Sequence, residues 1–251
     1  MKLNIVIPAF RDERVLETIE SIQGSELEGI NLRVIVQVGE SGEEYEKLIS
    51  QNFPWVEIGS EKDGGIFNAI NIGLKKCDGD LILTLGSDDR VSNKSCFQIV
   101  KEQFFAGYEC ISTDMQYTDL NWKPVRYWSA VNITSLNYFL GYQHAHFALF
   151  LSPKIYRDLN YFNEANTVNA DYEFFWHLTT YLKKNNVNSN KVKIACIQMK
   201  YGGNSSKSII KIIGHQVLII KFVFKNAPQL LPAVILFKWF HKIIQILKII
   251  R

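Results

Sequence analysis

The chain has 251 residues, of which 47% are hydrophobic and 21% charged, so it can bury the core of one large domain and is not a disordered chain. The net charge of +3 is unevenly distributed: residues 1–173 hold all 25 Asp and Glu against 15 Lys and Arg, whereas residues 174–251 hold the other 13 Lys and Arg and no acid. A basic tail on an acidic body predicts an anionic partner for the tail, either a membrane or a nucleic acid.

Strand and helix patterns alternate through the first third of the chain. The apolar run Leu3–Phe10 follows Lys2 without a small-residue cleavage site, which predicts a first strand rather than a signal peptide. The hydrophobic periodicity predicts the next elements as a helix at 14–24, a strand at 31–39, a helix at 43–53, a strand at 55–60, a helix at 66–77 and a strand at 80–86. Units of about 30 residues predict a parallel sheet with right-handed crossovers, whose ligands bind beyond the carboxyl ends of the strands.

Two adjacent acids, Asp88 and Asp89, follow the apolar run Leu81–Leu85 at such a strand end. Carboxylate oxygens at this position predict a site for a divalent cation that shares its ligand shell with phosphates and water. The glycines of "DGG", Gly64 and Gly65, would let a ligand approach the backbone closely. A solvated turn in which an Asp caps the following helix is the alternative. No GxGxxG or GxxxxGK[ST] motif is present, which gives a dinucleotide-binding oxidoreductase little support.

A second group of titratable residues lies at 144–173 and comprises His144, His146, Asp171 and Glu173. Asp171 begins a helical pattern, so it is either a helix cap or a general base facing the same crevice. His146 lies among apolar neighbours, where a hydrogen-bonded core histidine is the alternative to a ligand-binding one.

The four cysteines, Cys77, Cys96, Cys110 and Cys196, show no CxxC pair and no regular spacing. This predicts reduced core thiols rather than a zinc site or a disulfide framework.

The tail from Ile209 onward is apolar with single basic residues, and Pro228 and Pro232 divide it into two helical segments. Polar residues on one stripe of the second segment are Lys238, His241, Lys242, Gln245 and Lys248. This stripe is too polar for a spanning helix and suits the membrane interface. Packing of the tail on the domain or on a second subunit is the alternative. A nucleic-acid partner is not expected, because the tail is mostly apolar and contains a single arginine.

Taken in order, five stretches resemble the motifs of family 2 glycosyltransferases of the GT-A fold, especially bacterial enzymes of exopolysaccharide and O-antigen assembly. They are "EKDGGIFNAINIG", "GDLILTLGSDD", "HFALF", "DYEFF" and "GGNSS". The resemblance runs from Leu3 to about Ser206. It implies an α/β GT-A domain at residues 1–208, with a mostly parallel central sheet and flanking helices, followed by a basic amphipathic helical tail at residues 209–251.

The resemblance also implies roles for the matching residues. Asp88 matches the last acid of the family's DXD motif and, with Asp89, is expected to hold Mn²⁺ or Mg²⁺ against the donor phosphates. Asp171 matches the base that deprotonates the acceptor hydroxyl in a single, inverting displacement. The positions expected to bind the nucleotide sugar are Pro8, Ala9, Asp63, Gly64, Gly65, Ser87 and His146.

Two positions depart from the family's pattern. Val38 stands where the family usually has an Asp that reads the uracil edge, and a valine cannot accept the N–H of the base. Glu40 or Glu43 could substitute for it. Gly86 stands at the first DXD position, where close relatives often have Asn.

The sequence therefore predicts a metal-dependent inverting glycosyltransferase of the hexosyl type. It would move a sugar from a nucleotide diphosphate donor, expected to be a UDP-sugar, to a polyprenyl-linked glycan during surface polysaccharide assembly. The expected location is the cytoplasm, peripheral on the inner face of the plasma membrane. The rival hypothesis is a non-catalytic GT-A-like domain that binds a glycan or protein partner at the membrane. The presence of Asp88, Asp89 and Asp171 favours the enzyme.

Overall fold

The computed structural model describes residues 1–139, 144–166, 170–201, 209–226, 228–232 and 234–236. The elements, in chain order, are β1 (Lys2–Pro8), α1 (Val15–Gln23), β2 (Asn31–Gln37), α2 (Glu43–Asn52), β3 (Glu57–Gly59), α3 (Ile66–Lys75), β4 (Leu81–Thr84), β5 (Asp89–Val91), α4 (Cys96–Phe105), β6 (Cys110–Thr118), β7 (Pro124–Trp128), α5 (Ser135–Phe139), the 3₁₀ helix η1 (His146–Ala148), β8 (Leu149–Leu151), α6 (Pro153–Asp158), α7 (Ala170–Lys184), β9 (Ser189–Lys200), α8 (Ile209–Asn226) and the 3₁₀ helix η2 (Pro228–Leu230).

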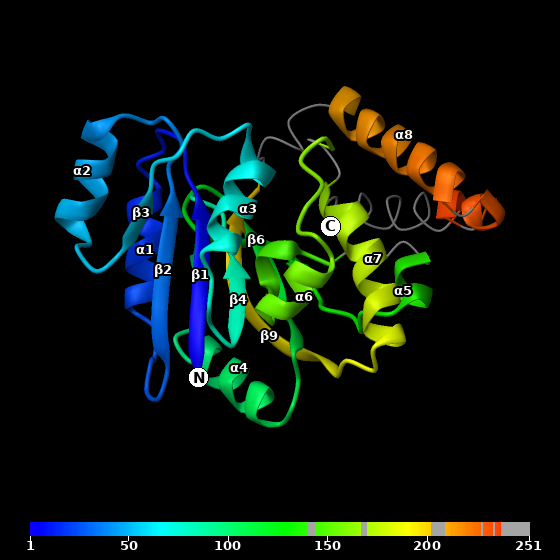
Figure 1. Cartoon of the computed structure of the whole chain (residues 1–251), viewed down its shortest axis with the longest axis horizontal. Coiled ribbons are helices and arrows are strands. Elements are labelled where there is room, and N and C mark those ends of the chain that lie inside the picture. Colours follow the sequence, from blue (N-terminus) through cyan, green and yellow to red (C-terminus); the bar gives the residue numbers. More distant parts are fainter. Residues whose placement is uncertain (140–143, 167–169, 202–208, 227, 233, 237–251) are drawn as a thin grey trace.

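One sheet runs through the centre of the described chain in the order β3-β2-β1-β4-β8-β6-β9-β5, with β7 paired to β6 (Figure 1). The first four strands pair in parallel, as the alternating pattern predicts. β8 then pairs antiparallel with both β4 and β6, so β6 runs in the direction of β4. β9 is parallel to β6. The carboxyl ends of β1, β2, β4, β6 and β9 consequently share one edge of the sheet.

Helices cover both faces of this sheet, which explains why its central strands are apolar at nearly every position. Alternate side chains of β1 enter different cores: Ile5 and Ile7 pack with α1, α2 and α4, whereas Val6 packs with α3, α6, α7 and α8. The sheet is therefore buried on both sides, and polar groups are accommodated mainly at its edges.

The first segment of the tail packs on the domain. In α8, Ile219 and Val223 are buried, and the ring of Phe222 lies 5.9 Å from that of Tyr172 and 5.5 Å from that of Trp176 in α7. Figure 1 shows α8 beside α7 at the periphery of the molecule. This first segment therefore packs on the domain, while Val217, Leu218 and Phe224 stay exposed.

The predicted polar stripe of the second tail segment, Lys238 to Lys248, lies outside the described residues. Among the helices that are described, none has the length and apolar character needed to cross a bilayer.

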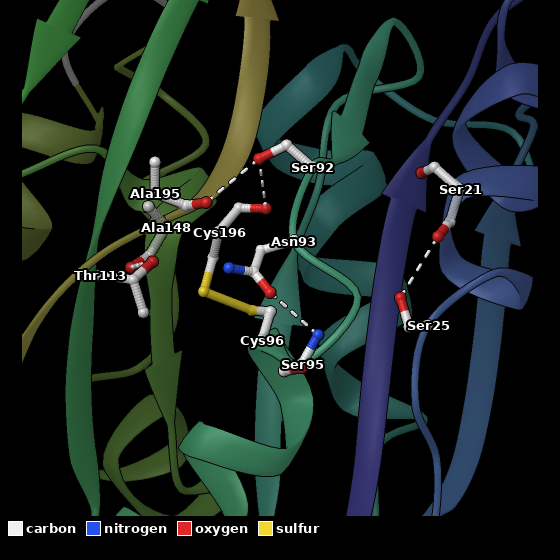
Figure 2. Close-up of a disulfide and its surroundings, with 10 residues drawn as sticks. All are labelled: Ser21, Ser25, Ser92, Asn93, Ser95, Cys96, Thr113, Ala148, Ala195 and Cys196. Carbon is white, nitrogen blue, oxygen red and sulfur yellow. Dashed lines mark hydrogen bonds between the residues drawn. A yellow bond between two sulfur atoms is a disulfide. The ribbon is translucent and has the colours of Figure 1, made fainter.

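The prediction that every cysteine is a reduced thiol is wrong for one pair. Cys96 at the start of α4 and Cys196 in β9 form a disulfide with a Cα–Cα distance of 5.4 Å (Figure 2). The two positions are 100 residues apart and meet because β5, just before α4, pairs with β9. Sequence spacing carries no information about such a pairing. Cys77 and Cys110 are free and buried, as predicted.

Candidate active site

The residues predicted to bind the donor gather at the shared edge of the sheet. Pro8 ends β1, and the N–H of Ala9 donates to the carbonyl of Gln37 at the end of β2 (2.8 Å). Ser87 and Asp88 follow β4, the next strand on the other side of β1. Adjacent parallel strands therefore place these backbone ends side by side, where a crevice is expected.

A charged network joins the ends of β1 and β4. Arg14 makes two bonds to the carboxylate of Asp12, both 2.8 Å, and its Nη1 lies 3.0 Å from Oδ2 of Asp88. The hydroxyl of Ser87 donates to Oδ2 of Asp12 (3.0 Å), which also accepts from Nη2 of Arg14. Burial alone would raise the pKa of Asp12, but the hydrogen bonds from Arg14 and Ser87 keep it below its ordinary value. Asp12 and Arg14 therefore hold the loop after β4 in a charged, ordered arrangement.

Asp89 has a very different environment from its neighbour. Its side chain is buried and accepts the N–H of Gly86, whereas the Asp88 carboxylate is about one-third exposed. Burial, together with the nearby Asp88 carboxylate, raises the pKa of Asp89 well above its ordinary value. A Cβ added at Gly86 would lie 2.6 Å from Oδ2 of Asp89, which gives a physical reason for the glycine at this DXD position.

The carboxylate oxygens of Asp88 and Asp89 are suitable ligands for a divalent cation. Asp88 offers an accessible carboxylate, and Oδ1 of Asp89 is a buried acceptor without a hydrogen-bond partner in the described structure. Across the described residues, no group of three or more His, Cys, Asp or Glu side chains could hold a metal ion. A cation here would need phosphate and water oxygens to complete its shell, as Mg²⁺ commonly does at phosphate sites.

The "DGG" loop brings a third carboxylate to the edge. Asp63 accepts the N–H of Gly65 (3.0 Å), and a Cβ added at Gly39 would lie 2.4 Å from its Oδ2. Gly39 adopts a left-handed φ of 55°, so the turn after β2 both needs a glycine and leaves room for Asp63. Val38 itself is fully buried in the core. Asp63 is therefore the carboxylate that reaches the turn where the family's base-reading Asp is missing.

Glu40 and Glu43, the two residues that could substitute for the missing Asp, differ in their surroundings. Glu40 lies 3.6 Å from Lys62, one residue before Asp63, whereas Glu43 is an exposed residue in the first turn of α2 that pairs with Lys47. Glu40 thus shares the neighbourhood of Asp63, and Glu43 faces its own helix.

His146 and Asp171 form a second group at the same edge. Nδ1 of His146 lies 4.0 Å from Oδ2 of Asp171. The backbone of His146 is tied to β4 because Thr84 donates its hydroxyl to the His146 carbonyl (3.4 Å). Burial lowers the pKa of His146, and the Asp171 carboxylate only partly opposes this. His146 is therefore held neutral beside a partly exposed carboxylate at the start of α7.

The other two residues of that segment are structural. Nε2 of His144 lies 2.9 Å from the carbonyl of Val131, so it carries the proton and donates it. Glu173 accepts hydrogen bonds from the side chains of Asn163 and Asn166, which brace the chain before α7.

Sequence reasoning missed Asp12, Arg14 and Thr18. The hydroxyl of Thr18 donates to the carbonyls of Asp89 (2.6 Å) and Ser87 (2.9 Å) and so fixes the acid loop to α1. The charged run "RDER" directly after the first strand was the available signal, because it occupies the same kind of strand end as Asp88.

Comparison with known proteins identifies the family. The model of glycosyl transferase family 2 matches residues 4–158, more than half of the chain. The chain belongs to this family. A dolichol-phosphate mannosyltransferase from Pyrococcus furiosus is 28% identical over 91 residues, which make up 35% of this chain and 26% of that relative. The aligned part therefore spans about a quarter of the mannosyltransferase.

Solved structures superpose on nearly the whole chain. Residues 1–349 of TarS from S. aureus in complex with UDP-GlcNAc match with a TM-score of 0.67 and 16% identity, covering 92% of this chain and 70% of that fragment. A mannosyltransferase from Pyrobaculum calidifontis in complex with GDP-Man and Mn²⁺ matches with a TM-score of 0.63 and 12% identity, covering 95% and 69%. The predicted α/β GT-A fold is confirmed.

Proposed function

We propose that this protein is a metal-dependent inverting glycosyltransferase that takes a sugar from a nucleotide diphosphate donor. The observation that carries the proposal is the joining of Asp12, Arg14, Ser87 and Asp88 into one network at the edge where His146 and Asp171 also lie. Relatives solved with UDP-GlcNAc or with GDP-Man and Mn²⁺ support the donor class.

In the proposed site, Asp88 is the accessible carboxylate for Mn²⁺ or Mg²⁺, and Asp89 stands behind it as the buried member of the pair. When bound, the cation would supply Lewis-acid stabilisation of the departing diphosphate. Ser87 fixes the loop through Asp12, while Pro8 and Ala9 bring the end of β1 to the donor. The donor would thus lie across the ends of β1 and β4.

Asp63, Gly64 and Gly65 are proposed to hold the nucleoside end of the donor. The Asp63 carboxylate at the turn after β2 would accept the imide N–H of a uracil or the N1–H of a guanine, which Val38 cannot do. Gly65, with φ of 120°, directly precedes α3 and leaves the backbone open to the ligand.

Asp171 is proposed as the general base that takes the proton of the acceptor hydroxyl as its oxygen attacks the anomeric carbon. Its carboxylate is about one-third exposed: Oδ1 accepts the N–H of Tyr172 (2.8 Å), and Oδ2 lies 4.0 Å from Nδ1 of His146, beyond hydrogen-bond distance. Neutral His146 would orient the Asp171 carboxylate and contact the donor phosphates. It would not take the acceptor's proton itself. One displacement of this geometry inverts the configuration.

The proposed acceptor is a polyprenyl-linked glycan at a membrane surface, with residues 1–208 as the catalytic domain and residues 209–251 as the membrane-associated tail. Support comes from α8, which exposes Val217, Leu218 and Phe224 beside the exposed cations Lys221 and Lys225. Apolar side chains interleaved with lysines suit an anionic membrane interface. The role in surface polysaccharide assembly at the inner face of the plasma membrane belongs to the same proposal.

A thermal-shift screen of uridine, guanosine and thymidine diphosphates, each with and without Mn²⁺, tests the donor site. A ligand that binds only the folded state stabilises it by about 2.7 kcal/mol at 100 times its dissociation constant. We expect one nucleotide to stabilise the wild-type protein in the presence of Mn²⁺ and to do so less without the metal. Asp88→Asn should remove the metal dependence.

The absence of any shift in folded protein would contradict the enzymatic proposal. It would favour the rival hypothesis of a non-catalytic domain that binds a glycan or a protein at the membrane.

A further inference from the structure

Three basic side chains, from β5, β7 and β9, gather around the aromatic rings of the β6–β7 hairpin. The Arg90 guanidinium lies 4.0 Å and the Lys200 ammonium 4.2 Å from the ring centroid of Trp122, and the Arg126 guanidinium lies over Tyr117 (5.2 Å). We call Arg90, Arg126, Lys200 and the three rings of Tyr117, Trp122 and Trp128 the cationic hairpin. Cation–ring contacts of this kind occur about once per 70–80 residues, so their concentration here is unusual.

Within the described residues, neither arginine of the cationic hairpin forms an ion pair with an acid. Arg126 contacts the rings of Tyr117 and Trp128, and Nε of Arg90 donates to the side-chain oxygen of Gln198. Partial burial lowers the pKa of Arg90, with Glu17 opposing. The guanidinium groups therefore keep donors for a ligand.

The neighbouring acids are already engaged. Glu17 lies 3.6 Å from Lys200. Asp119 accepts backbone N–H groups of its own turn, and Asp114 accepts the Tyr127 hydroxyl and the N–H of Ala130. This positive cluster lies in residues that belong mostly to the acidic body, where acids outnumber bases by 25 to 15. Its charge is a local feature rather than a consequence of a basic domain.

The cationic hairpin borders the candidate active site. Met199 pairs with Asp89 on one side and with Tyr117 on the other, so two strand spacings, about 10 Å, separate the acid from the ring-bearing strand. Trp128, at the far end of β7, lines a small cavity with His144 and Ala145, directly before His146. The cluster thus extends from the acid loop towards the His146–Asp171 pair, on the side away from the "DGG" loop.

We propose that the cationic hairpin binds an anionic group of the acceptor, a phosphate or a carboxylate, while the rings support the adjoining sugar. This inference rests on the proposed function and adds that the acceptor carries a negative charge. Arginine offers paired donors that match both oxyanions, and a ring beneath it fixes the guanidinium before the ligand arrives. Two sources supply this chemistry: the diphosphate of a lipid-linked acceptor, or an acidic sugar in the glycan.

Calorimetric titration of the full-length protein, with its donor site filled by the stabilising nucleotide diphosphate and Mn²⁺, tests the proposal. The probes are a short prenyl diphosphate carrying N-acetylglucosamine, a disaccharide ending in glucuronic acid, and its neutral glucose counterpart. We expect at least one anionic probe to bind about tenfold more tightly than the neutral one, since a charge-assisted hydrogen bond is worth about 1.5 kcal/mol or more. Preference for the diphosphate or for the carboxylate identifies the source.

Substitutions distinguish binding by the cationic hairpin from general electrostatic attraction. Arg126→Gln and Arg90→Gln should each weaken the anionic probe about tenfold and leave the neutral probe unchanged. Arg126→Lys keeps the charge but not the paired donors, so it should recover only part of the affinity, and it also controls for folding. Lys123→Gln removes an exposed base of the β6–β7 hairpin that contacts none of the cationic hairpin's three rings, and it should bind as the wild type does.

Equal affinity of the wild type for all three probes would overturn the proposal. So would a Lys123→Gln variant that binds the anionic probe as weakly as Arg126→Gln does. If the wild type binds the nucleotide but shows no anionic preference, this inference alone is wrong. If the wild type binds no nucleotide, the proposed function fails and the acceptor role with it.

Discussion

Two neighbouring carboxylates, Asp88 and Asp89, show how much the environment of a residue decides its chemistry. Asp88 is partly exposed and paired with Arg14, while Asp89 is buried beside Gly86 and has a raised pKa. The motif predicts both as metal ligands. The geometry gives them different parts, with Asp88 as the accessible oxygen donor and Asp89 as a buried acceptor that a nearby cation would keep ionised.

Arg14 should compete with the metal for Asp88, because its guanidinium occupies the same carboxylate. In Arg14→Gln, Mn²⁺ alone should bind about fivefold more tightly, since a partly exposed ion pair is worth about 1 kcal/mol. Titration of free Mn²⁺ by electron paramagnetic resonance measures this. Arg11→Gln is the matched control, because Arg11 lies against the Phe10 ring. Unchanged Mn²⁺ affinity in Arg14→Gln would show that the pair does not compete with the metal.

Asp171→Asn should lower turnover by about 10²–10⁴-fold, the usual contribution of a general base, and leave nucleotide affinity unchanged. Steady-state transfer assays and nucleotide titration measure the two quantities. Glu173→Gln, two residues along the same helix and bonded to Asn163 and Asn166, should stay within a few fold of the wild type. Wild-type turnover in Asp171→Asn would rule out the assignment of the base.

His144 predicts a loss of stability in mild acid. Burial lowers its pKa to about 4, below the ordinary value near 6.5, so the unfolded state takes up a proton first as the pH falls. The free energy of unfolding should decrease from about pH 6.5 down to pH 4, by up to about 3 kcal/mol from this residue. Urea unfolding across this range should show a smaller decrease in His144→Gln. Equal slopes for both proteins would contradict the assignment.

Among the elements, the β5–β9 pairing has consequences that reach beyond the site. It places Asp89 next to Met199, Arg90 next to Gln198, and the start of α4 close enough to β9 for the disulfide. The local pattern identifies the strands before Asp88, because each has its own apolar run. It gives no sign of which distant strand lies beside β5, since that depends on chain segments about 100 residues apart.

The Cys96–Cys196 disulfide should stabilise the oxidised protein by about 2–4 kcal/mol, because it closes a long loop in the unfolded chain. Urea unfolding with and without reductant measures this, and the double variant Cys96→Ala/Cys196→Ala should not respond to reductant. Thiol titration of the unfolded, unreduced chain should find two free groups, Cys77 and Cys110. Four reactive thiols would show that the pair is reduced in the isolated protein.

For the whole molecule, the separation of an acidic body from a basic tail remains the main guide to its partner. α8 meets both requirements of a tail at an interface: Ile219 and Val223 dock on the domain, while Leu218 and Phe224 stay exposed near Lys221. The described tail therefore packs on the domain and still exposes apolar and basic side chains on its outer face.

The variant Leu218→Ser/Phe224→Ser should reduce binding to anionic phosphatidylglycerol vesicles by about tenfold or more, since each buried apolar side chain contributes roughly 1.5–3 kcal/mol. Co-sedimentation measures the bound fraction. Phe105→Ser, an equally exposed aromatic on α4, is the control and should bind as the wild type does. Equal pelleting of all three proteins would argue against a membrane role for this face.

The sequence by itself determined the parallel half of the sheet, the acids at the end of β4 and the family motifs, because these depend on local periodicity and on residues close together in the chain. Only the tertiary structure decided that Asp12 and Arg14 meet Asp88, that Asp63 reaches the turn beside Val38, and that Cys96 meets Cys196. Each of these contacts joins separate strand ends or elements. The register and order of strands set such contacts, and a residue's neighbours in sequence do not encode them.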